Sequence, residues 1–444
     1  MGCPRWKGHL RYTVKAMSTL KAVRGTRDLL PPETALWNHI EKTARQVFTR
    51  YNFGEIRTPI FEDTALFARG VGEETDIVSK EMYTWEDKAR AQSEKTQMLT
   101  LRPENTAGVV RAYIEHQLGE SGQLQKLYYV GPQFRRERPQ KGRYRQFSQI
   151  GAEVIGPPSA GSESPLRDAE VLEMLASLLD ELGITGWTLE LNSVGSSADR
   201  ARYNETLRAA LVPVVGQMCV DCQRRAVTNP LRVLDCKVPA DQPIIDTLPV
   251  IADSLDEASK AHFAAVIAAL DAAGVPYTRN HRLVRGLDYY TRTTFEFSHH
   301  GDGLGAQNAL LGGGRYDGLS EMLGGPRAPG IGFAMGEDRL VLTLLALEAA
   351  APEKAHAYIA PVGEGMNPAA LALARDLRRQ GLRIELGEGS FRLKKSFESA
   401  DKTARRIVIL GEDELQSGIL TVKTFATGMQ TKVDRVELAA YLSQ

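Results

Sequence analysis

Two apolar, strand-like segments joined by a basic connection constrain the fold of this 444-residue chain more than any other stretch. The segments span residues 127–130 and 150–155, and between Phe134 and Gln146 the connection carries six cations and one carboxylate, Glu137. A Pro- and Gly-containing connection between strand-like segments predicts an antiparallel hairpin with a long loop. We therefore expect a sheet with antiparallel strands at the centre of the fold.

The side chains of the returning segment of this hairpin also follow an alternating pattern. Arg143, Arg145, Phe147 and Gln149 would share one face of an extended strand, because successive side chains point to opposite faces. Guanidinium groups held on a sheet suit a multiply charged anion such as a nucleoside triphosphate. The alternative is a basic hairpin that only keeps the protein soluble, and the remainder of the chain has to decide between the two.

Length and charge limit the class of protein. A chain of this length predicts about three domains, each able to bury its own core. Lys+Arg and Asp+Glu both number 55, and this neutral balance argues against a nucleic-acid coat or a membrane-surface protein while leaving room for a local RNA-binding patch. No apolar run approaches the roughly 20 residues that span a bilayer. The sequence predicts a soluble, cytoplasmic protein.

The first 16 residues are basic but lack the apolar core of a signal peptide. They are interpreted as a disordered leader, or as residues that precede a true start at Met17.

Four cysteines are present, which fits a reducing compartment better than a disulfide framework. Cys219 and Cys222 have the spacing of half a zinc site, and Cys236 could add a third thiolate. The sequence offers no evident fourth ligand nearby, so a His or a water would have to complete the site. Ordinary thiols are the favoured interpretation, with zinc as the alternative.

The first part of the chain predicts a helix over residues 31–51, followed by a strand that Pro59 interrupts. A proline belongs on an edge strand, and an edge strand beside a long helix is a natural surface for a second subunit. A hairpin over residues 82–101 then leads to Glu104 and Thr106 at the entrance of a further helix. Taken alone, these two residues are typical of a helix cap.

The middle of the chain predicts a helix over residues 167–182, a strand over 187–191 and a largely helical block up to Tyr277 that looks like an insertion. The sheet is expected to resume at residues 283–297. The triple glycine of residues 312–314 would permit close backbone approach to a ligand, although a glycine run is a weak signal.

Arg339 is expected near the start of a helix that follows a glycine-spaced strand. A cation there opposes the helix dipole unless an anion lies in front of it. After Pro352, alternating strands and helices predict a small domain with parallel strands and right-handed crossovers, completed by a hairpin that turns at Thr427 and Gly428. A basic helix near residues 392–406 could contact RNA phosphates.

These motifs together resemble those of the class II aminoacyl-tRNA synthetases. The segment around Pro59 is similar to their dimer-interface motif, the 134–147 hairpin to their ATP-binding motif, and residues 332–339 to their third motif. Residues 283–290 and 312–318 are similar to signatures of the histidyl-tRNA synthetase family. Motifs found together in this order are specific, and the resemblance covers nearly all of the chain from about residue 17.

The resemblance implies roles for individual residues. Three arginines would be catalytic because they surround the phosphates of ATP, namely Arg285, Arg135 and Arg339. The ATP-binding residues would be Arg135, Glu137, Phe147 and Arg339. The histidine-binding residues would be Glu104, Thr106, Arg135, Gln149, Glu153, Arg285, Tyr289, Tyr290 and Tyr316.

Within the histidine site, Glu104, Thr106 and Gln149 would receive the α-amino group, while Glu153 and Tyr290 would read the imidazole. An imidazole presents one donor and one acceptor, which a carboxylate and a phenol can satisfy. The implied substrates are L-histidine, ATP with Mg²⁺, and tRNA(His), and the implied assembly is a homodimer. In-line attack at phosphorus then needs alignment and positive charge rather than a protein nucleophile.

Two residues depart from the family pattern. Asn105 stands where a glycine is usual, and Asn tolerates a positive φ better than most residues. Asp338 stands where a glutamate is usual. Two other classes of protein are the alternatives: a regulatory paralogue that binds histidine, and a synthetase for another amino acid. The three arginines and the C-terminal lobe argue against the first, and residues 283–290 argue against the second.

The predicted fold is α+β: a catalytic domain with a mainly antiparallel sheet flanked by helices, a helical insertion, and a C-terminal α/β domain with a small mixed sheet. The expected boundaries are a leader at 1–16, catalytic parts at 17–194 and 279–350, the insertion at 195–278, and an anticodon-binding domain at 351–444.

Overall fold

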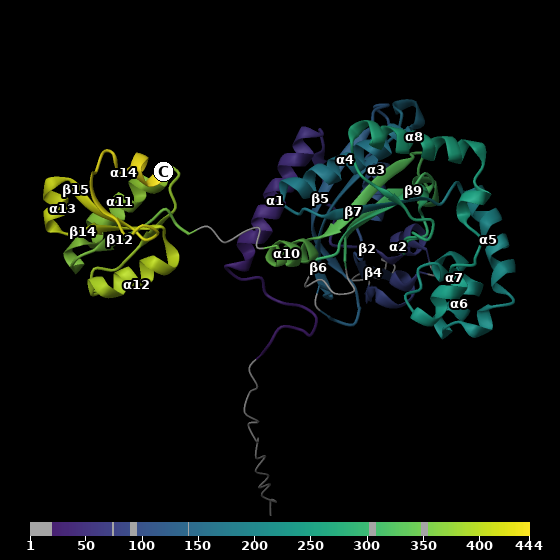
Figure 1. Cartoon of the computed structure of the whole chain (residues 1–444), viewed down its shortest axis with the longest axis horizontal. Helices are drawn as coiled ribbons and strands as arrows, with labels where there is room; N and C mark the ends of the chain where they lie inside the picture. Colours follow the sequence, from purple (N-terminus) through teal and green to yellow (C-terminus); the bar gives the residue numbers. More distant parts are fainter. Residues whose placement is uncertain (1–19, 73–74, 89–95, 141, 302–307, 348–353) are drawn as a thin grey trace, which may run out of the picture. The chain divides into compact units, whose positions relative to one another are not determined.

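The computed structural model describes residues 20–72, 75–88, 96–140, 142–301, 308–347 and 354–444 (Figure 1). The predicted leader, Met17, Cys3 and Lys141 lie outside these ranges. The chain divides into two compact units, residues 1–350 and residues 351–444. Within the described residues, no helix is both long and apolar enough to cross a membrane.

The first unit is built on an eight-stranded sheet with the order β1-β5-β6-β11-β10-β9-β7-β8. The strands are β1 (Gly54–Glu55), β5 (Gln125–Phe134), β6 (Gln146–Ile155), β7 (Trp187–Ser193), β8 (Thr278–Arg279), β9 (Thr291–His299), β10 (Ala309–Arg315) and β11 (Gly330–Gly336). Only the outermost pairs, β1 with β5 and β7 with β8, are parallel. The predicted hairpin of β5 and β6 is confirmed, with Val130 opposite Ile150.

Helices pack on one face of this sheet, and the site described below occupies the other. The helices are α1 (Glu33–Arg50), α4 (Pro165–Glu181), α8 (Glu257–Ala273) and α10 (Glu337–Ala346). The period of two in β6 separates the faces. Ile150, Ala152 and Val154 pack with the helices in one apolar core. Gln149 and Glu153 therefore point to the opposite face.

A separate three-stranded sheet is followed by α3, whose first residue, Thr106, donates to Glu153 on this second face. The strands of this small sheet are β2 (Phe61–Asp63), β3 (Tyr83–Asp87) and β4 (Gln97–Leu101). The helices of the same stretch of chain are α2 (Thr64–Val71), a π-helix (Ile77–Glu81) and α3 (Thr106–Glu115). The hairpin predicted over residues 82–101 is β3 paired with β4. The strand predicted around Pro59 is instead two short strands, because a proline cannot donate to a ladder. One joins the large sheet as its edge, and the other pairs with β4.

The helical insertion is confirmed as a group of helices with its own apolar core. It contains α5 (Ser197–Leu211), α6 (Val220–Thr228), α7 (Gln242–Ile245) and short 3₁₀ segments (Pro230–Val233, Pro239–Asp241 and Ile251–Ser254). Tyr203, Leu207, Cys222 and Val233 are among the core side chains. The following α8 is different, since its Val266, Ile267 and Leu270 belong to the core of the large sheet.

The strand expected to begin at residue 283 is shorter than predicted. Residues 281–290 form an irregular segment, and β9 begins only at Thr291. The apolar residues Leu283, Val284, Tyr289 and Tyr290 are buried without being in a ladder, which explains why the sequence looked strand-like.

The second unit has a five-stranded sheet in the order β13-β12-β14-β15-β16. The strands β12 (Ala357–Pro361), β13 (Ile384–Leu386) and β14 (Arg406–Leu410) are parallel, and β15 (Ile419–Thr424) and β16 (Gln430–Asp434) add an antiparallel hairpin. Its helices are α11 (Asn367–Arg379), α12 (Leu393–Thr403), α13 (Glu412–Ser417) and α14 (Leu438–Ser443). This mixed sheet, with the antiparallel sheet of the first unit, confirms the predicted α+β architecture.

A buried ion pair joins the helical layer to the sheet in the first unit. Arg315 at the end of β10 and Asp168 on α4 are both fully buried, and the Arg315 guanidinium donates to the Asp168 carboxylate at 2.6 and 3.1 Å. Arg315 also donates to the Ser162 carbonyl at 2.9 Å and to Asp317 at 2.8 Å. A buried pair of this kind is costly to break, because one charge remains without compensation.

Asp168→Asn should therefore lower the free energy of unfolding of the first unit by about 3–5 kcal/mol. All four tryptophans precede residue 350, so tryptophan fluorescence during urea denaturation reports on this unit. The matched control is Glu181→Gln on the same helix, which loses only an exposed pair with Arg50 and should cost less than about 1 kcal/mol. Equal losses in the two variants would contradict the role of the buried pair.

Candidate active site

A cavity of about 930 Å³ lies on the face of the large sheet opposite α1, α4, α8 and α10. Its walls come from β5, β6, β9, β10 and β11, the irregular segment 281–290, the entrance of α3 and one side of the insertion. The predicted site residues that line it are Glu104, Thr106, Arg135, Glu137, Phe147, Gln149, Arg285, Tyr289, Tyr290, Tyr316 and Arg339. Glu153 lies one layer deeper, behind Thr106 and Tyr316.

The deepest part of the site is a hydrogen-bonded group centred on Glu153. The Thr106 hydroxyl donates to one carboxylate oxygen of Glu153 at 2.7 Å, and the Tyr316 hydroxyl donates to the other at 2.7 Å. Glu153 is fully buried. A β-carbon on Gly332 would lie 1.7 Å from this carboxylate, so only glycine at that position leaves room for Glu153.

Burial raises the pKa of Glu153 to about 8, against the opposing effect of the hydrogen bonds from Thr106 and Tyr316. Burial also raises the pKa of Glu104, although the backbone N–H groups of Ala107 and Thr106 act against it. These N–H groups donate to Glu104 at 3.0 and 2.8 Å. Glu104 thus caps α3, as expected for a residue at a helix entrance, and it also lines the cavity.

Four tyrosines enclose this end of the cavity. Tyr289 packs against both Tyr290 and Tyr316, with ring centroids 4.8 and 5.9 Å apart. Burial raises the pKa of Tyr290 to about 12, so its hydroxyl remains a donor at neutral pH. Tyr129 on β5 also lines the cavity, and its buried hydroxyl has no hydrogen-bond partner within the described part of the chain.

Sequence reasoning missed Tyr129 as a site residue because it stands in an apolar run typical of a buried strand. A usable signal is Gly151, which lies directly opposite Tyr129 on β6. A β-carbon at Gly151 would lie 2.4 Å from the Tyr129 ring. A glycine opposite a tyrosine in a central strand pair therefore indicates that the ring crosses the sheet face.

Arginine side chains gather at the other end of the cavity. Arg135, just after β5, donates to the Pro103 carbonyl at 2.9 Å, and its guanidinium lies 5.1 Å from the centre of the Phe147 ring. Glu137 lies 3.1 Å from Arg143 and 3.9 Å from Arg135. Arg143 lines the cavity as well. The hairpin thus holds two guanidinium groups beside one carboxylate and one aromatic ring.

Arg285 reaches the cavity from the irregular segment and forms an ion pair with Glu296 on β9. Its guanidinium lies across β10, because a β-carbon on Gly312 would come within 2.5 Å of it. Likewise, a β-carbon on Gly314 would lie 2.8 Å from the Tyr290 ring. The triple glycine was expected to let a ligand approach the backbone closely. In the structure, the side chains of Arg285 and Tyr290 occupy the space above two of these glycines.

Arg339 lies in the first turn of α10, as predicted, and donates to the Ala309 carbonyl at 2.6 Å. Burial lowers the pKa of Arg339, and the nearby charges of Arg143 and Arg285 lower it further. Several cations are thus held closer together than their mutual repulsion favours. An anion bound between them would relieve that repulsion.

The predicted alternation along the returning strand is wrong in part. The strand β6 begins at Gln146, so only Phe147 and Gln149 follow the alternation inside it. The Arg145 side chain instead donates to the carbonyls of Glu137 and Arg24, at 3.5 and 3.3 Å. This contact ties the hairpin to the beginning of the described chain.

The two departures from the family pattern have local explanations. Asn105 has φ −120°, so no positive φ is required there, and its side-chain oxygen accepts a hydrogen bond from the Thr58 hydroxyl at 2.6 Å. Asp338 forms an ion pair with Arg27 at 2.9 Å. The shorter side chain of Asp338 therefore has an ionic partner in Arg27, near the beginning of the described chain.

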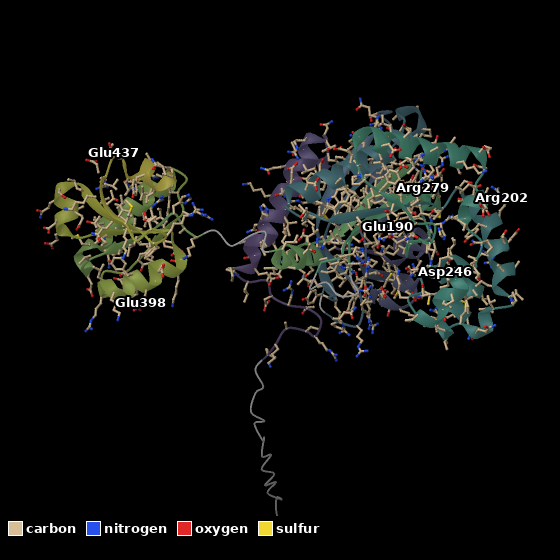
Figure 2. All side chains as sticks on the ribbon, in the orientation of Figure 1. Glu190, Arg202, Asp246, Arg279, Glu398 and Glu437 are labelled. Carbon is tan, nitrogen blue, oxygen red and sulfur yellow. The ribbon has the colours of Figure 1, made fainter. Side chains whose placement is uncertain are left out.

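The insertion forms the remaining wall of the cavity. Glu190 on β7 lines the cavity and accepts from Asn280 at 2.9 Å. Arg282, also in the lining, pairs at 2.8 Å with Asp246, just after α7, and Figure 2 labels both Glu190 and Asp246. The cavity therefore combines a carboxylate and phenols at one end with guanidinium groups at the other. This arrangement can bind a small polar molecule next to a polyphosphate.

An antiparallel sheet that carries an arginine-bearing hairpin and an arginine at a helix start defines the catalytic unit of a class II aminoacyl-tRNA synthetase. The family model described as histidyl-tRNA synthetase matches residues 25–340, and the one described as anticodon binding domain matches residues 356–444. The chain belongs to the histidyl-tRNA synthetase family.

Individual relatives agree. The histidine–tRNA ligase of Koribacter versatilis is 73% identical over 424 residues, which cover 95% of this chain and 96% of that protein. That of Solibacter usitatus is 56% identical over 425 residues, covering 95% and 99%. The crystal structure of apo histidyl-tRNA synthetase from S. aureus matches with a TM-score of 0.76 at 38% identity, covering 96% of this chain and 100% of that one.

The raised pKa of Glu153 predicts a pH dependence of stability. The folded state keeps a proton that the unfolded state, with a glutamate pKa near 4.5, has lost, so stability should fall as pH rises from about 5 to about 8. The total is on the order of 4–5 kcal/mol. Glu153→Gln removes the titrating group, so thermal unfolding of the variant should depend less on pH than that of the wild type. Parallel pH profiles would contradict this. Glu120→Gln, an exposed carboxylate, should keep the wild-type profile.

Proposed function

We propose that the cavity is where this chain performs both steps of its family's reaction, with the residues assigned below. The chain is a ligase: ATP activates L-histidine to histidyl-adenylate with release of diphosphate, and histidine then passes to the 3′-terminal ribose of tRNA(His). The observation that carries the assignment is the division of one cavity between a buried carboxylate–phenol group and a cluster of guanidinium groups. One end suits an imidazole, and the other suits phosphates.

The arginines carry the first step in this proposal. Arg135 and Arg285 bind the α-phosphate from two sides, and Arg339 binds the γ-phosphate. Glu137 and Phe147 position Arg135, because one lies beside its guanidinium and the other beneath it. The histidine carboxylate attacks the α-phosphorus in line, and the bond to the diphosphate breaks. Positive charge already fixed in the cavity stabilises the charge that develops on the phosphoryl oxygens.

The carboxylate–phenol end selects histidine in this proposal. Glu104, Thr106 and Gln149 receive the α-amino group, and the side-chain oxygen of Gln149 is buried without a partner in the described part of the chain, so it can accept from that group. Glu153 and Tyr290 read the two imidazole nitrogens. An analogue that lacks one nitrogen would leave a buried polar group unpaired, at a cost of roughly 1–3 kcal/mol.

Glu153 is reached through its neighbours. Each of its oxygens accepts one hydroxyl, from Thr106 or Tyr316, and keeps a second lone pair that can accept from an imidazole N–H. Tyr289 packs against Tyr290 and Tyr316 and keeps their rings in place.

Magnesium accompanies ATP in this proposal. The carboxylates of Glu81 and Glu137 line the phosphate end of the cavity, and oxygen ligands are those that Mg²⁺ prefers. Burial, followed by the nearby charge of Glu137, raises the pKa of Glu81, which is the situation that a divalent cation relieves. When bound, the ion would neutralise part of the phosphate charge.

The chain's parts have distinct tasks in this proposal. Residues 17–194 and 279–350 carry catalysis, residues 195–278 form the insertion, and residues 351–444 bind the anticodon. The exposed cations of α12, such as Lys394, Lys395 and Lys402, suit contact with RNA phosphates. Transfer of histidine to the tRNA again depends on positioning. The enzyme is placed in the cytoplasm, where its tRNA substrate is used.

We also propose that the enzyme is a homodimer that pairs through the region around Pro59. Ile60, Phe61 and Trp85 are each more than one-third exposed, and the rings of Phe61 and Trp85 are in contact, with centroids 6.0 Å apart. The edge strand β1 belongs to the same region of sequence. Exposed aromatics beside a sheet edge are typical of a surface that a partner covers.

Histidine-dependent exchange between ATP and diphosphate tests the function. The wild type should exchange with histidine and with no other amino acid. Arg285→Ala should lower the exchange rate by roughly 100- to 1,000-fold with little change in histidine affinity, because the lost charge acts mainly in the transition state. The control Arg279→Ala changes an exposed arginine on β8 and should leave both values unchanged. No exchange with histidine would overturn the function, and equal losses in rate and affinity would overturn only the role of Arg285.

The homodimer predicts a mass in solution of 97.6 kDa, twice the 48.8 kDa of one chain. Light scattering after size exclusion measures it. The double substitution Phe61→Glu and Trp85→Glu should shift the protein to monomers, because it places charges in the proposed interface. Val436→Glu, which changes an even more exposed apolar residue of the second unit, should not. A monomeric wild type would rule out the dimer.

A further inference from the structure

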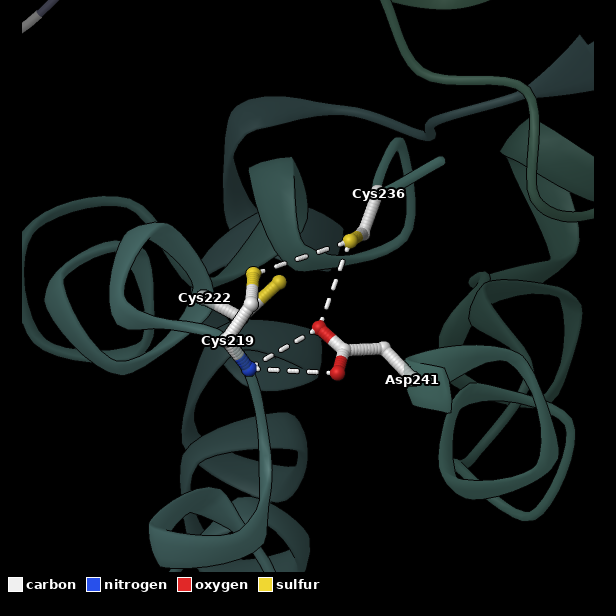
Figure 3. Close-up of side chains that lie close together, drawn as sticks. All are labelled: Cys219, Cys222, Cys236 and Asp241. Atoms are coloured by element: carbon white, nitrogen blue, oxygen red, sulfur yellow. Dashed lines mark hydrogen bonds between the residues drawn. The ribbon is translucent and has the colours of Figure 1, made fainter. Parts of the chain in front are cut away.

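Four side chains that can bind a metal converge inside the insertion, and none of them is assigned to the reaction. Cys219 immediately precedes α6, Cys222 lies in its first turn, Cys236 follows the next 3₁₀ segment, and Asp241 ends the one after that. The three sulfurs and one carboxylate oxygen all lie within 4.8 Å of one another (Figure 3). The sequence indicated three of these ligands, and the folded chain supplies the fourth.

The distances suit a tetrahedral ion. With Zn–S bonds of about 2.3 Å and a Zn–O bond of about 2.0 Å, tetrahedral geometry places two sulfurs about 3.8 Å apart and a sulfur about 3.5 Å from an oxygen. The Cys219 and Cys236 sulfurs are 3.9 Å apart, and the Cys236 sulfur is 3.3 Å from an Asp241 oxygen. A disulfide needs a bond of about 2.0 Å, so this pair of sulfurs is not bonded.

Asp241 is the residue that a plain thiol cluster leaves unexplained. It is only 1% exposed, and within the described ranges its contacts come from two of the cysteines and not from a cation. Its partners there are the Cys219 N–H, at 3.1 and 3.2 Å, and the Cys236 sulfur. A buried carboxylate normally has a cation beside it or binds a metal. Three thiols supply no positive charge, whereas a divalent ion does.

One backbone donor faces the cluster directly. The backbone N–H of Val238 points at the Cys236 sulfur, 3.4 Å away, and such a donor stabilises a negative sulfur. Cys222 and Cys236 are buried in the apolar core of the insertion. Three cysteines and one carboxylate supply four protein ligands, which is the number that a structural zinc site uses.

We propose that Cys219, Cys222, Cys236 and Asp241 bind one Zn²⁺ that holds the insertion together beside the active site. The ion joins the start of α6 to the two 3₁₀ segments that follow it. The Cys236 carbonyl accepts from the Gln242 side chain at 2.8 Å, and Gln242 in turn accepts from Arg282 at 2.6 Å. The site is thereby connected to the cavity wall that carries Arg285.

Metal analysis of purified, reduced protein by mass spectrometry tests the proposal directly. We expect about one zinc per chain in the wild type and less than about one-tenth in Cys222→Ser. Protein stripped of metal and titrated with Co²⁺ should show thiolate-to-cobalt charge transfer and the visible bands of a tetrahedral ion. Stripping should also lower the thermal midpoint, and zinc should restore it.

Two further variants test the proposal even if Cys222→Ser fails to fold. Asp241→Asn should retain the fold but bind cobalt more weakly and with a shifted spectrum, because it loses an anionic ligand. The matched control is Asp221→Asn, an exposed carboxylate between the first two cysteines that is not in the cluster, and it should bind as the wild type does. Absence of zinc together with absence of cobalt thiolate bands in fully reduced protein would overturn the proposal, as would a disulfide among these cysteines.

Discussion

The buried contact between Arg315 and Asp168 is the interaction on which the geometry of the site depends. It fixes the end of β10 against α4, so the next residue, Tyr316, projects from the opposite face at a set height. Tyr316 then donates to Glu153, and Glu153 accepts from Thr106 at the start of α3. The buried pair on the helical side and the hydrogen bonds at the floor of the cavity are thus joined by the backbone of two adjacent residues, Arg315 and Tyr316. Because an unpaired member would be costly, each contact restricts the next.

The cavity separates its charges by depth. Carboxylates whose pKa is raised by burial lie at the floor, and guanidinium groups lie nearer the hairpin and the start of α10. A single ligand with a neutral ring at one end and a phosphate at the other complements both regions, and histidyl-adenylate is such a molecule. The insertion contributes Arg232 and Gln242 to the lining of the same cavity, so a segment without an assigned role in the chemistry still shapes this space.

Local patterns in the sequence were sufficient for the hairpin of β5 and β6, for the parallel strands of the second unit and for the position of Arg339 in the first turn of α10. Each depends on neighbours in sequence. Three other features could not be predicted from local patterns, because they depend on how the chain folds. The position of Arg145 is set by the chain near residue 24, the segment 281–290 is buried without being a strand, and Asp241 meets the cysteines only after the insertion folds. The resemblance to a family supplied the roles of the site residues, which spacing alone does not provide.

The glycines of the central strands have a consequence for how this enzyme can change over time. At Gly312, Gly314 and Gly332 a single added methyl group would collide with Arg285, Tyr290 and Glu153 respectively. The middle of a sheet ordinarily exchanges one apolar residue for another at small cost. Here that freedom is absent at the places where these three side chains cross the strands. Variation in such a chain is expected to accumulate in its periphery and in its helices, while these strand positions remain glycine.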